Sequence, residues 1–207
     1  MAEIFKQAID SETVRALNDA IDSVSDGDSF EMLIPPKTTN ILEVYKDTLK
    51  QQCPKIVWNA DSFVVTRTAT ERGNRAAQCW HFDNFRKTTL IVLKSNEGEK
   101  NGDILIRKNL RKAPTNIWST MLTKVFWTNP VTWFVLRIPA IRDSFFTRVP
   151  LVAGDVMIFD GAVIYHGNLP IHAGTRRSIL IHDGPVFKDA WITKFFHYLC
   201  TVIFYKK

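Results

Sequence analysis

The chain has 207 residues, of which 45% are hydrophobic and 23% are charged, and its formal net charge is +6. These values indicate one globular domain with a sizeable core and exclude an intrinsically disordered chain. Three widely spaced cysteines exclude a disulfide framework, and no uncharged run is long enough to cross a membrane. With a charged start that lacks the apolar run of a signal peptide, the sequence predicts a cytoplasmic protein.

Helical spacing characterises the beginning of the chain. Residues 10–24 open with capping-type side chains, after which apolar residues recur every three or four positions from Val14 to Val24. The same spacing predicts a second helix at 40–52. Because both helices are rich in acidic residues, we expect residues 1–55 to form a helical scaffold outside the functional site.

From residue 56 the pattern changes to short strands rich in β-branched and aromatic residues. The predicted strands are 56–58, 62–69, 88–94, 103–106, 155–159, 162–166 and 176–182. Several short strands separated by Gly and Asn turns are typical of a β-sandwich or a β-barrel.

The segment CWHFDNF, residues 79–85, places His81 and Asp83 two positions apart. In a strand, side chains at i and i+2 point to the same face, so these two would project together while Trp80 and Phe82 point to the other face. An imidazole nitrogen beside a carboxylate oxygen forms half of a metal site. The His-x-Asp spacing also arises by chance in a chain with five histidines. Whether the pair belongs to a metal site therefore depends on the rest of the sequence.

The later strands supply the missing groups. The segment AVIYHGNLPIHAGTRRSILIH places His166 at the end of one strand and Arg176 at the start of the next, with Ser178 on the same face as Arg176. Two histidines and one carboxylate with open coordination positions fit a non-haem iron(II) site. A nearby arginine is suited to binding a carboxylate through two parallel hydrogen bonds.

The order His-x-Asp, a long gap, His, and then Arg-x-Ser resembles the iron(II)- and 2-oxoglutarate-dependent dioxygenases. The segments HFDNFRKTTLIVLK, NGDILI and GDVMIFDGAVIYHG are similar to that superfamily too, nearest to its phytanoyl-CoA and prolyl hydroxylase branches. The resemblance covers about residues 60–106 and 150–183. It implies a mainly β fold, the double-stranded β-helix (a jelly-roll or cupin-like barrel), with core strands in 56–106 and 150–183 of a single domain, 1–207.

The resemblance implies that His81, Asp83 and His166 are the catalytic metal ligands, which bind Fe(II). It also implies that Arg176, helped by Ser178, binds the distal carboxylate of the co-substrate 2-oxoglutarate. The activity would be that of an oxidoreductase, a hydroxylase in the simplest case, which consumes O2, releases succinate and CO2, and is supported by ascorbate. Two alternatives stay open: a desaturase or cyclase at the same site, and a jelly-roll module that binds a metal without turnover.

The sequence leaves open which of two adjacent arginines faces the predicted site, because the strand register is not known. A slip of one residue would turn Arg177 inward in place of Arg176. Further residues that hold 2-oxoglutarate cannot be identified from the sequence, and Thr66 and Thr88 are guesses.

Three other side chains lie near the predicted site. His172 falls in a turn and is expected to face solvent. His182 would share the face of Arg176, although a structural role is favoured for it. Cys79 is interpreted as a small buried side chain.

Residues 107–149 hold most of the positive charge, with eight basic side chains and one acidic, and therefore a net charge of +7. They also hold Trp118, Trp127, Trp133 and four phenylalanines. Three interpretations compete: an ordinary packed insertion or lid, a membrane-interface element beside anionic lipid, and a nucleic-acid surface. We favour lipid over nucleic acid because Val, Ile, Leu and Phe gather between Trp133 and Ile138.

The tail, residues 184–207, is apolar and aromatic and ends in two lysines. As a helix it would either cap the barrel or lie on a membrane surface. Two such segments lead us to expect a small or amphiphilic substrate, including a lipid-linked one. They also predict peripheral membrane contact through 107–149 and 189–207.

Overall fold

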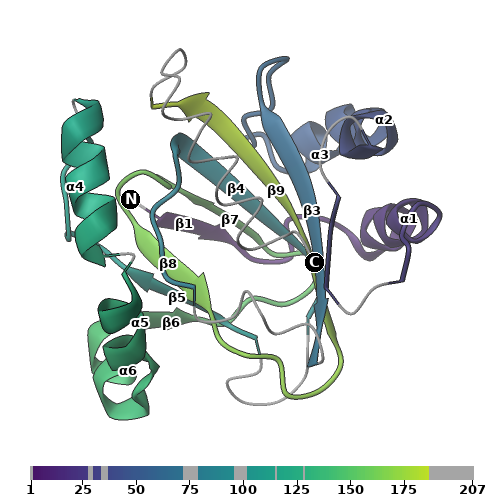
Figure 1. The fold of residues 1–207 in the computed structure, drawn as a ribbon. Helices are drawn as coiled ribbons and strands as arrows, with labels where there is room; N and C mark the ends of the chain where they lie inside the picture. The colour runs from purple at the N-terminus through teal and green to yellow at the C-terminus, as the bar shows by residue number, and fades with distance from the viewer. Residues whose placement is uncertain are drawn as a thin grey trace.

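The protein is described by a computed structural model that covers residues 2–27, 30–33, 37–71, 79–95, 102–114, 116–127 and 129–186. Within these ranges the chain forms two antiparallel sheets, with helices on both outer sides (Figure 1). No helix in the described ranges is long and apolar enough to cross a membrane.

The larger sheet has six strands in the order β1-β7-β4-β9-β3-β2. Their bounds are β1 Ala2–Phe5, β2 Phe30–Leu33, β3 Phe63–Thr70, β4 Phe85–Lys94, β7 Val156–Phe159 and β9 Thr175–Pro185. The smaller sheet has the order β6-β5-β8, with β5 Ile104–Arg107, β6 Thr147–Val149 and β8 Tyr165–Asn168. Strand β9 lies at the centre of the larger sheet, between β3 and β4, so its side chains face both of the layers beside that sheet.

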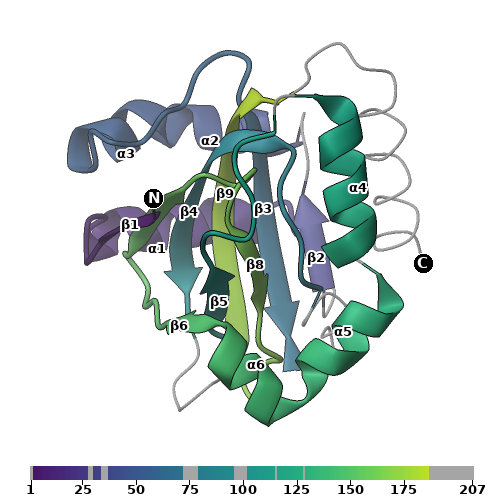
Figure 2. The same cartoon turned by 90° about the vertical axis from the view of Figure 1, so that its left-hand side faces the viewer.

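The helices form two groups. The first group is α1 Ser11–Asp22, α2 Lys37–Leu42, the short 3-10 helix η1 Glu43–Tyr45 and α3 Lys46–Gln52. The second group, α4 Ile117–Trp127, α5 Pro130–Arg137 and α6 Pro139–Phe145, lies along the other side of the molecule (Figure 2). The side chain of Asp10 accepts a hydrogen bond from the backbone N–H of Thr13, which explains why α1 begins there.

Three apolar clusters follow from this layering. One lies between α1–α3 and the outer face of the larger sheet and includes Leu17 and Ile179. A second lies between the two sheets and includes Leu90 and Ile106. The third, around Tyr165, lies between the smaller sheet and α4–α6. Alternate residues of each strand therefore face different cores, and the inner core positions the functional site.

The structure confirms the mainly β fold class and most of the predicted elements. The prediction of a strand at 56–58 was wrong, because Ile56 and Trp58 are buried but have no partner strand. The predicted helix at 40–52 is divided among α2, η1 and α3. Strand β8 begins three residues later than predicted and continues past His166. The predictions for the tail beyond residue 186 lie outside the described residues.

Candidate metal centre

The three predicted metal ligands come together between the sheets. His81 forms an isolated antiparallel bridge with His166, in which the backbone N–H of each donates to the carbonyl of the other at 2.9 and 3.0 Å. Asp83 follows two residues later, and its backbone N–H donates to the Gly161 carbonyl at 2.8 Å. One ligand atom from each of His81, Asp83 and His166 lies within 4.8 Å of the other two. This donor set is the one that suits a non-haem iron(II) site.

The backbone fixes which nitrogen of each histidine is available. Nδ1 of His81 lies 2.9 Å from the Cys79 carbonyl, and Nδ1 of His166 lies 3.0 Å from the Ile164 carbonyl. Because a carbonyl only accepts hydrogen bonds, Nδ1 must carry the proton in both rings. In a neutral ring with this tautomer Nε2 keeps its lone pair, and the Nε2 atoms of both histidines face the Asp83 carboxylate. A histidine that binds a metal is commonly oriented in this way.

The two oxygens of Asp83 have different surroundings. Oδ1 lies 3.4 Å from Nε2 of His81 and 3.6 Å from Nε2 of His166. Oδ2 accepts a hydrogen bond from the Thr88 hydroxyl at 2.6 Å, and that hydroxyl lies 3.1 Å from Nδ1 of His182. If Thr88 donates to Asp83, then His182 must donate to Thr88. The hydrogen bonds from His182 to Thr88 and from Thr88 to Asp83 hold the carboxylate so that Oδ1 points toward the imidazoles of His81 and His166.

The electrostatics of the site keep the carboxylate charged and the buried imidazole neutral. Burial by itself would raise the pKa of Asp83, but the neighbouring histidines, first of all His166, outweigh it and hold the pKa well below its ordinary value. Burial lowers the pKa of His166 to about 4, against the opposing effect of Asp83. A charged carboxylate beside a neutral imidazole is the state that a metal ion requires.

Two glycines leave the space in which this arrangement forms. A Cβ at Gly161 would lie 2.5 Å from Oδ2 of Asp83 and 2.6 Å from the Thr88 hydroxyl. A Cβ at Gly167 would collide with the ring of Trp80. Larger residues at either position would therefore displace the segment that bears His81 and Asp83.

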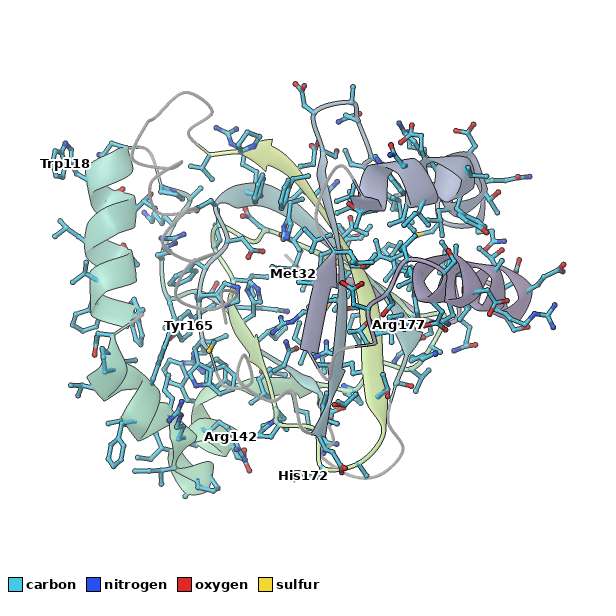
Figure 3. All side chains as sticks on the ribbon, turned by 45° about the vertical axis from the view of Figure 1, so that its right-hand side comes forward. Met32, Trp118, Arg142, Tyr165, His172 and Arg177 are labelled. Atoms are coloured by element: carbon cyan, nitrogen blue, oxygen red, sulfur yellow. The ribbon has the colours of Figure 1, made fainter. Side chains whose placement is uncertain are left out.

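The structure places the two neighbouring arginines on opposite faces of β9. Arg177 is buried on the outer face, where it donates to the Thr68 hydroxyl at 3.0 Å, to Asn18 and to Asp22 (Figure 3). Arg176 alternates with it and lines a small pocket between the sheets, together with Val92, Asp103, Ile104 and Leu151. Burial lowers the pKa of Arg176 to about 10, aided by Arg67 and opposed by Asp103.

The remaining predicted residues divide between the two faces. Ser178 is buried in register with Arg67 and Val92, on the same face as Arg176. Thr66 pairs with Ile179 instead, so it lies on the other face. His172 is exposed, as expected, whereas Cys79 is half-buried and not fully buried as predicted.

The sequence did not identify the residues that orient Asp83. Thr88 was a guess, and a contact between His182 and Thr88 was not foreseen. These two residues are 94 positions apart, and they meet because β4 and β9 pair with Thr88 opposite His182. Arg67, which pairs with Ser178 on the same face as Arg176, was not considered either. Only the strand register would have indicated these residues.

The basic segment packs directly behind the ligand residues. The indole N–H of Trp133 donates to the Trp80 carbonyl at 3.1 Å, and the Tyr165 hydroxyl donates to the Trp127 carbonyl at 2.5 Å. Trp80 precedes His81, and Tyr165 precedes His166. The Arg111 guanidinium also lies 3.9 Å from the centre of the Phe82 ring. The interpretation as a packed insertion is therefore correct for the inner side of α4–α6.

No family model and no curated protein matches the sequence. Among solved structures, HygX from Streptomyces hygroscopicus with iron bound has a TM-score of 0.60 at 12% identity, over 90% of this chain and 82% of HygX. HygX with nickel and 2-oxoglutarate bound has a TM-score of 0.59 at 14% identity, over 90% and 83%. A prolyl 4-hydroxylase from Phytophthora capsici has a TM-score of 0.54 at 13% identity, over 96% and 67%. At these identities the likeness establishes the fold: the chain has the jelly-roll fold of HygX and of this prolyl 4-hydroxylase, as the sequence resemblance implied.

Proposed function

We propose that the protein is an iron(II)- and 2-oxoglutarate-dependent oxygenase whose metal ligands are His81, Asp83 and His166. The observation that supports this most is the shared orientation of one Asp83 oxygen and the Nε2 atoms of His81 and His166 within 4.8 Å. The residues fit Fe(II), because two imidazoles and one carboxylate on one side leave positions open for other ligands.

Arg176 is the residue that we propose for the distal carboxylate of 2-oxoglutarate, with Ser178 as a second donor. Arg176 lies in the pocket between the sheets and has no ion pair among the described residues, whereas Arg177 is engaged with Asp22. A buried guanidinium without a carboxylate partner is costly, and a dicarboxylate co-substrate would supply that partner. The arginine that the sequence favoured is therefore also the one that the geometry favours.

The reaction that we propose is hydroxylation of an unactivated carbon. One atom of O2 enters the substrate C–H bond as a hydroxyl group, and the other enters 2-oxoglutarate, which loses CO2 and becomes succinate. Bound iron supplies the oxidising chemistry. The protein positions the reactants: Thr88 and His182 orient Asp83, and Arg176 fixes one end of the co-substrate.

The substrate that we propose is a small or amphiphilic molecule, with lipid-linked molecules included. Its support is the group of exposed apolar side chains on α4 and α5, helices that contact the residues next to His81 and His166. HygX has been solved with hygromycin B bound, so this fold accepts a small-molecule ligand.

The test is succinate formation from 2-oxoglutarate by the purified protein with iron(II) and ascorbate in air. Wild type is compared with Asp83→Ala and Arg176→Ala. The matched controls are Asp47→Ala and Arg15→Ala, which remove the same charges at exposed positions of α3 and α1. We expect succinate from wild type and both controls, and a loss of more than about 100-fold for Asp83→Ala, beyond the loss typical of a supporting residue.

Anaerobic binding of iron and 2-oxoglutarate separates the alternatives. If wild type binds neither, the proposal fails. If it binds iron but not 2-oxoglutarate and forms no succinate, the protein is a metal-binding module without turnover. If Arg176→Ala binds 2-oxoglutarate as well as wild type does, the role of Arg176 is refuted while that of the ligands stands.

A further inference from the structure

Helix α4 exposes a continuous apolar face. Its exposed side chains are spaced at i, i+4, i+7 and i+8, so they form one continuous face. They are between 66% and 71% exposed, and they are Trp118, Leu122, Val125 and Phe126. The inner side carries Thr120, which is buried, and Trp127, which packs in the cluster around Tyr165. A helix that only packs on a globular protein would place its apolar residues inward instead.

The same surface continues into the next two helices. Val131 is 72% exposed and Phe134 is 70% exposed, and the apolar spacing then runs on through partly exposed side chains. We call this surface the helical face, and its members are Trp118, Leu122, Val125, Phe126, Val131, Phe134, Val135, Ile138 and Ile141. Figure 3 shows Trp118 directed away from the body of the protein. Exposed apolar patches of this extent mark interaction sites in soluble proteins.

The positive charge of the segment that carries the helical face indicates which kind of partner would bind there. Residues 107–149 have a net charge of +7, and Asp143 is the one acidic residue of that segment. Among the basic residues, Lys108 and Lys112 are exposed before α4, and Arg137 is exposed at the end of α5. A second copy of this chain would bring two such charges together, so self-association through this face is disfavoured. The charge favours an anionic partner.

We propose that the helical face docks on an anionic lipid surface. Such a surface offers both an apolar layer for aromatic and aliphatic side chains and negative headgroups for Lys and Arg. Three aromatic residues with flanking cations are the composition of an interfacial element. The helices are also too short to cross a bilayer, so the contact would be peripheral.

The docked protein would hold its metal centre in a defined orientation to the membrane. The inner side of α4–α5 is hydrogen-bonded to Trp80 and Tyr165, which are adjacent in sequence to His81 and His166. The docking itself does not depend on catalysis, and only the link to a lipid-linked substrate rests on the proposed function.

The test is flotation of the full-length protein with vesicles. One set is phosphatidylcholine alone, and the other contains roughly a third of phosphatidylglycerol. The first variant is the triple substitution Trp118→Gln, Phe126→Gln and Phe134→Gln. The matched control is Val44→Gln with Val152→Gln, since these apolar side chains are also exposed, at 79% and 50%, but lie outside the helical face. Circular dichroism and thermal unfolding without vesicles establish that each variant is folded.

We expect wild type and the control to float with the anionic vesicles and the triple variant to lose about tenfold or more of that binding. Binding should weaken at about 1 M salt, where the Debye length falls to about 3 Å. No binding of wild type to anionic vesicles would overturn the proposal, and the face would then be assigned to a protein partner. Undiminished binding of the triple variant, or equal binding to neutral vesicles, would overturn it as well. If wild type floats with the vesicles but neither forms succinate nor binds 2-oxoglutarate, the oxygenase proposal fails and the docking surface stands.

Discussion

The two faces of β9 have different roles although their residues alternate along one strand. On the outer face, Arg177 joins the sheet to α1 through Thr68, Asn18 and Asp22. On the inner face, His182 contacts Thr88 beside the candidate metal centre, and Arg176 lines the pocket between the sheets, where the described residues offer it no carboxylate at bonding distance. The outer arginine has its partners within the protein, whereas the inner one is suited to a partner from outside. We therefore expect inner changes to affect binding and outer changes to affect stability.

The largest effect should come from Gly161→Ala, beside the inner face. The added Cβ would lie 2.5 Å from Oδ2 of Asp83, so the carboxylate must leave the position in which Oδ1 faces the histidines. We expect iron affinity to fall by more than about 100-fold, since even changes to supporting residues cost 10- to 100-fold. Isothermal titration with iron(II) under anaerobic conditions measures it. Gly27→Ala, in which nothing lies within 4 Å of the added Cβ, is the control for iron affinity alone, because its φ of +74° makes alanine strained there. Wild-type affinity in Gly161→Ala would show that the site tolerates a shifted carboxylate.

The outer face is tested by Arg177→Met. The substitution removes hydrogen bonds to Asn18 and Thr68 and leaves these buried groups without a donor. We expect a loss of about 2–4 kcal/mol in the free energy of unfolding. Urea denaturation followed by circular dichroism measures it. Arg176→Met is the matched comparison and should leave stability near that of wild type. Equal losses in both variants would contradict the division between the faces.

Thr88→Val sharpens the comparison on the inner face. Valine has nearly the same shape as threonine but cannot donate to Asp83 or accept from His182. We expect iron affinity to fall by about tenfold, the lower end of the range for residues that orient metal ligands. Thr89→Val, at the neighbouring buried position of β4, is the control. An unchanged affinity in Thr88→Val would mean that the two histidines and the backbone position Asp83 by themselves.

The smallest expected effect is the pH dependence of stability that comes from Asp22 on the outer face. The hydrogen bond from Arg177 lowers the pKa of Asp22, against a smaller opposing effect of burial. A carboxyl whose pKa is lower in the folded state stabilises the protein above the pKa of the unfolded state, near 3.9, and loses that contribution as the pH falls further. Because Asp22 is half exposed, we expect less than about 1 kcal/mol. Unfolding measured between neutral pH and about pH 3 should show a steeper loss for wild type than for Asp22→Asn. Parallel curves would exclude this contribution.

The alternation of β9 and the shared face of His81 and Asp83 could be predicted because both depend on local spacing, whereas the full ligand set was implied by the resemblance to the iron(II)- and 2-oxoglutarate-dependent dioxygenases. His81 with Asp83, and Arg176 with Ser178, share a face through the two-residue period of strands. That rule also separated Arg176 from Arg177 once the strand register was known. The structure has the predicted strands at most positions from 62 to 182 for the same reason.

The elements that the sequence did not predict form through contacts with residues far away in the chain. Strands β1, β2 and β6 have at most four residues each, and β1 forms by pairing with β7, more than 150 residues later. Ile56 and Trp58 show the reverse case, in which strand-like composition reflects burial against the helices without a neighbouring strand. The link from Thr88 to His182 likewise comes from pairing between β4 and β9, which no short stretch of sequence specifies.

The unequal exposure of the two histidines has a consequence for ion exchange. The His81 side chain is 41% exposed, whereas those of His166 and Asp83 are 8% and 9% exposed. A bound ion would thus be reached by water from the His81 side and enclosed by protein on the other. Release should begin with the His81 ring turning away while His166 and Asp83 still hold the ion. The lifetime of the loaded protein in the presence of a chelator would then be governed by one side chain at the rim.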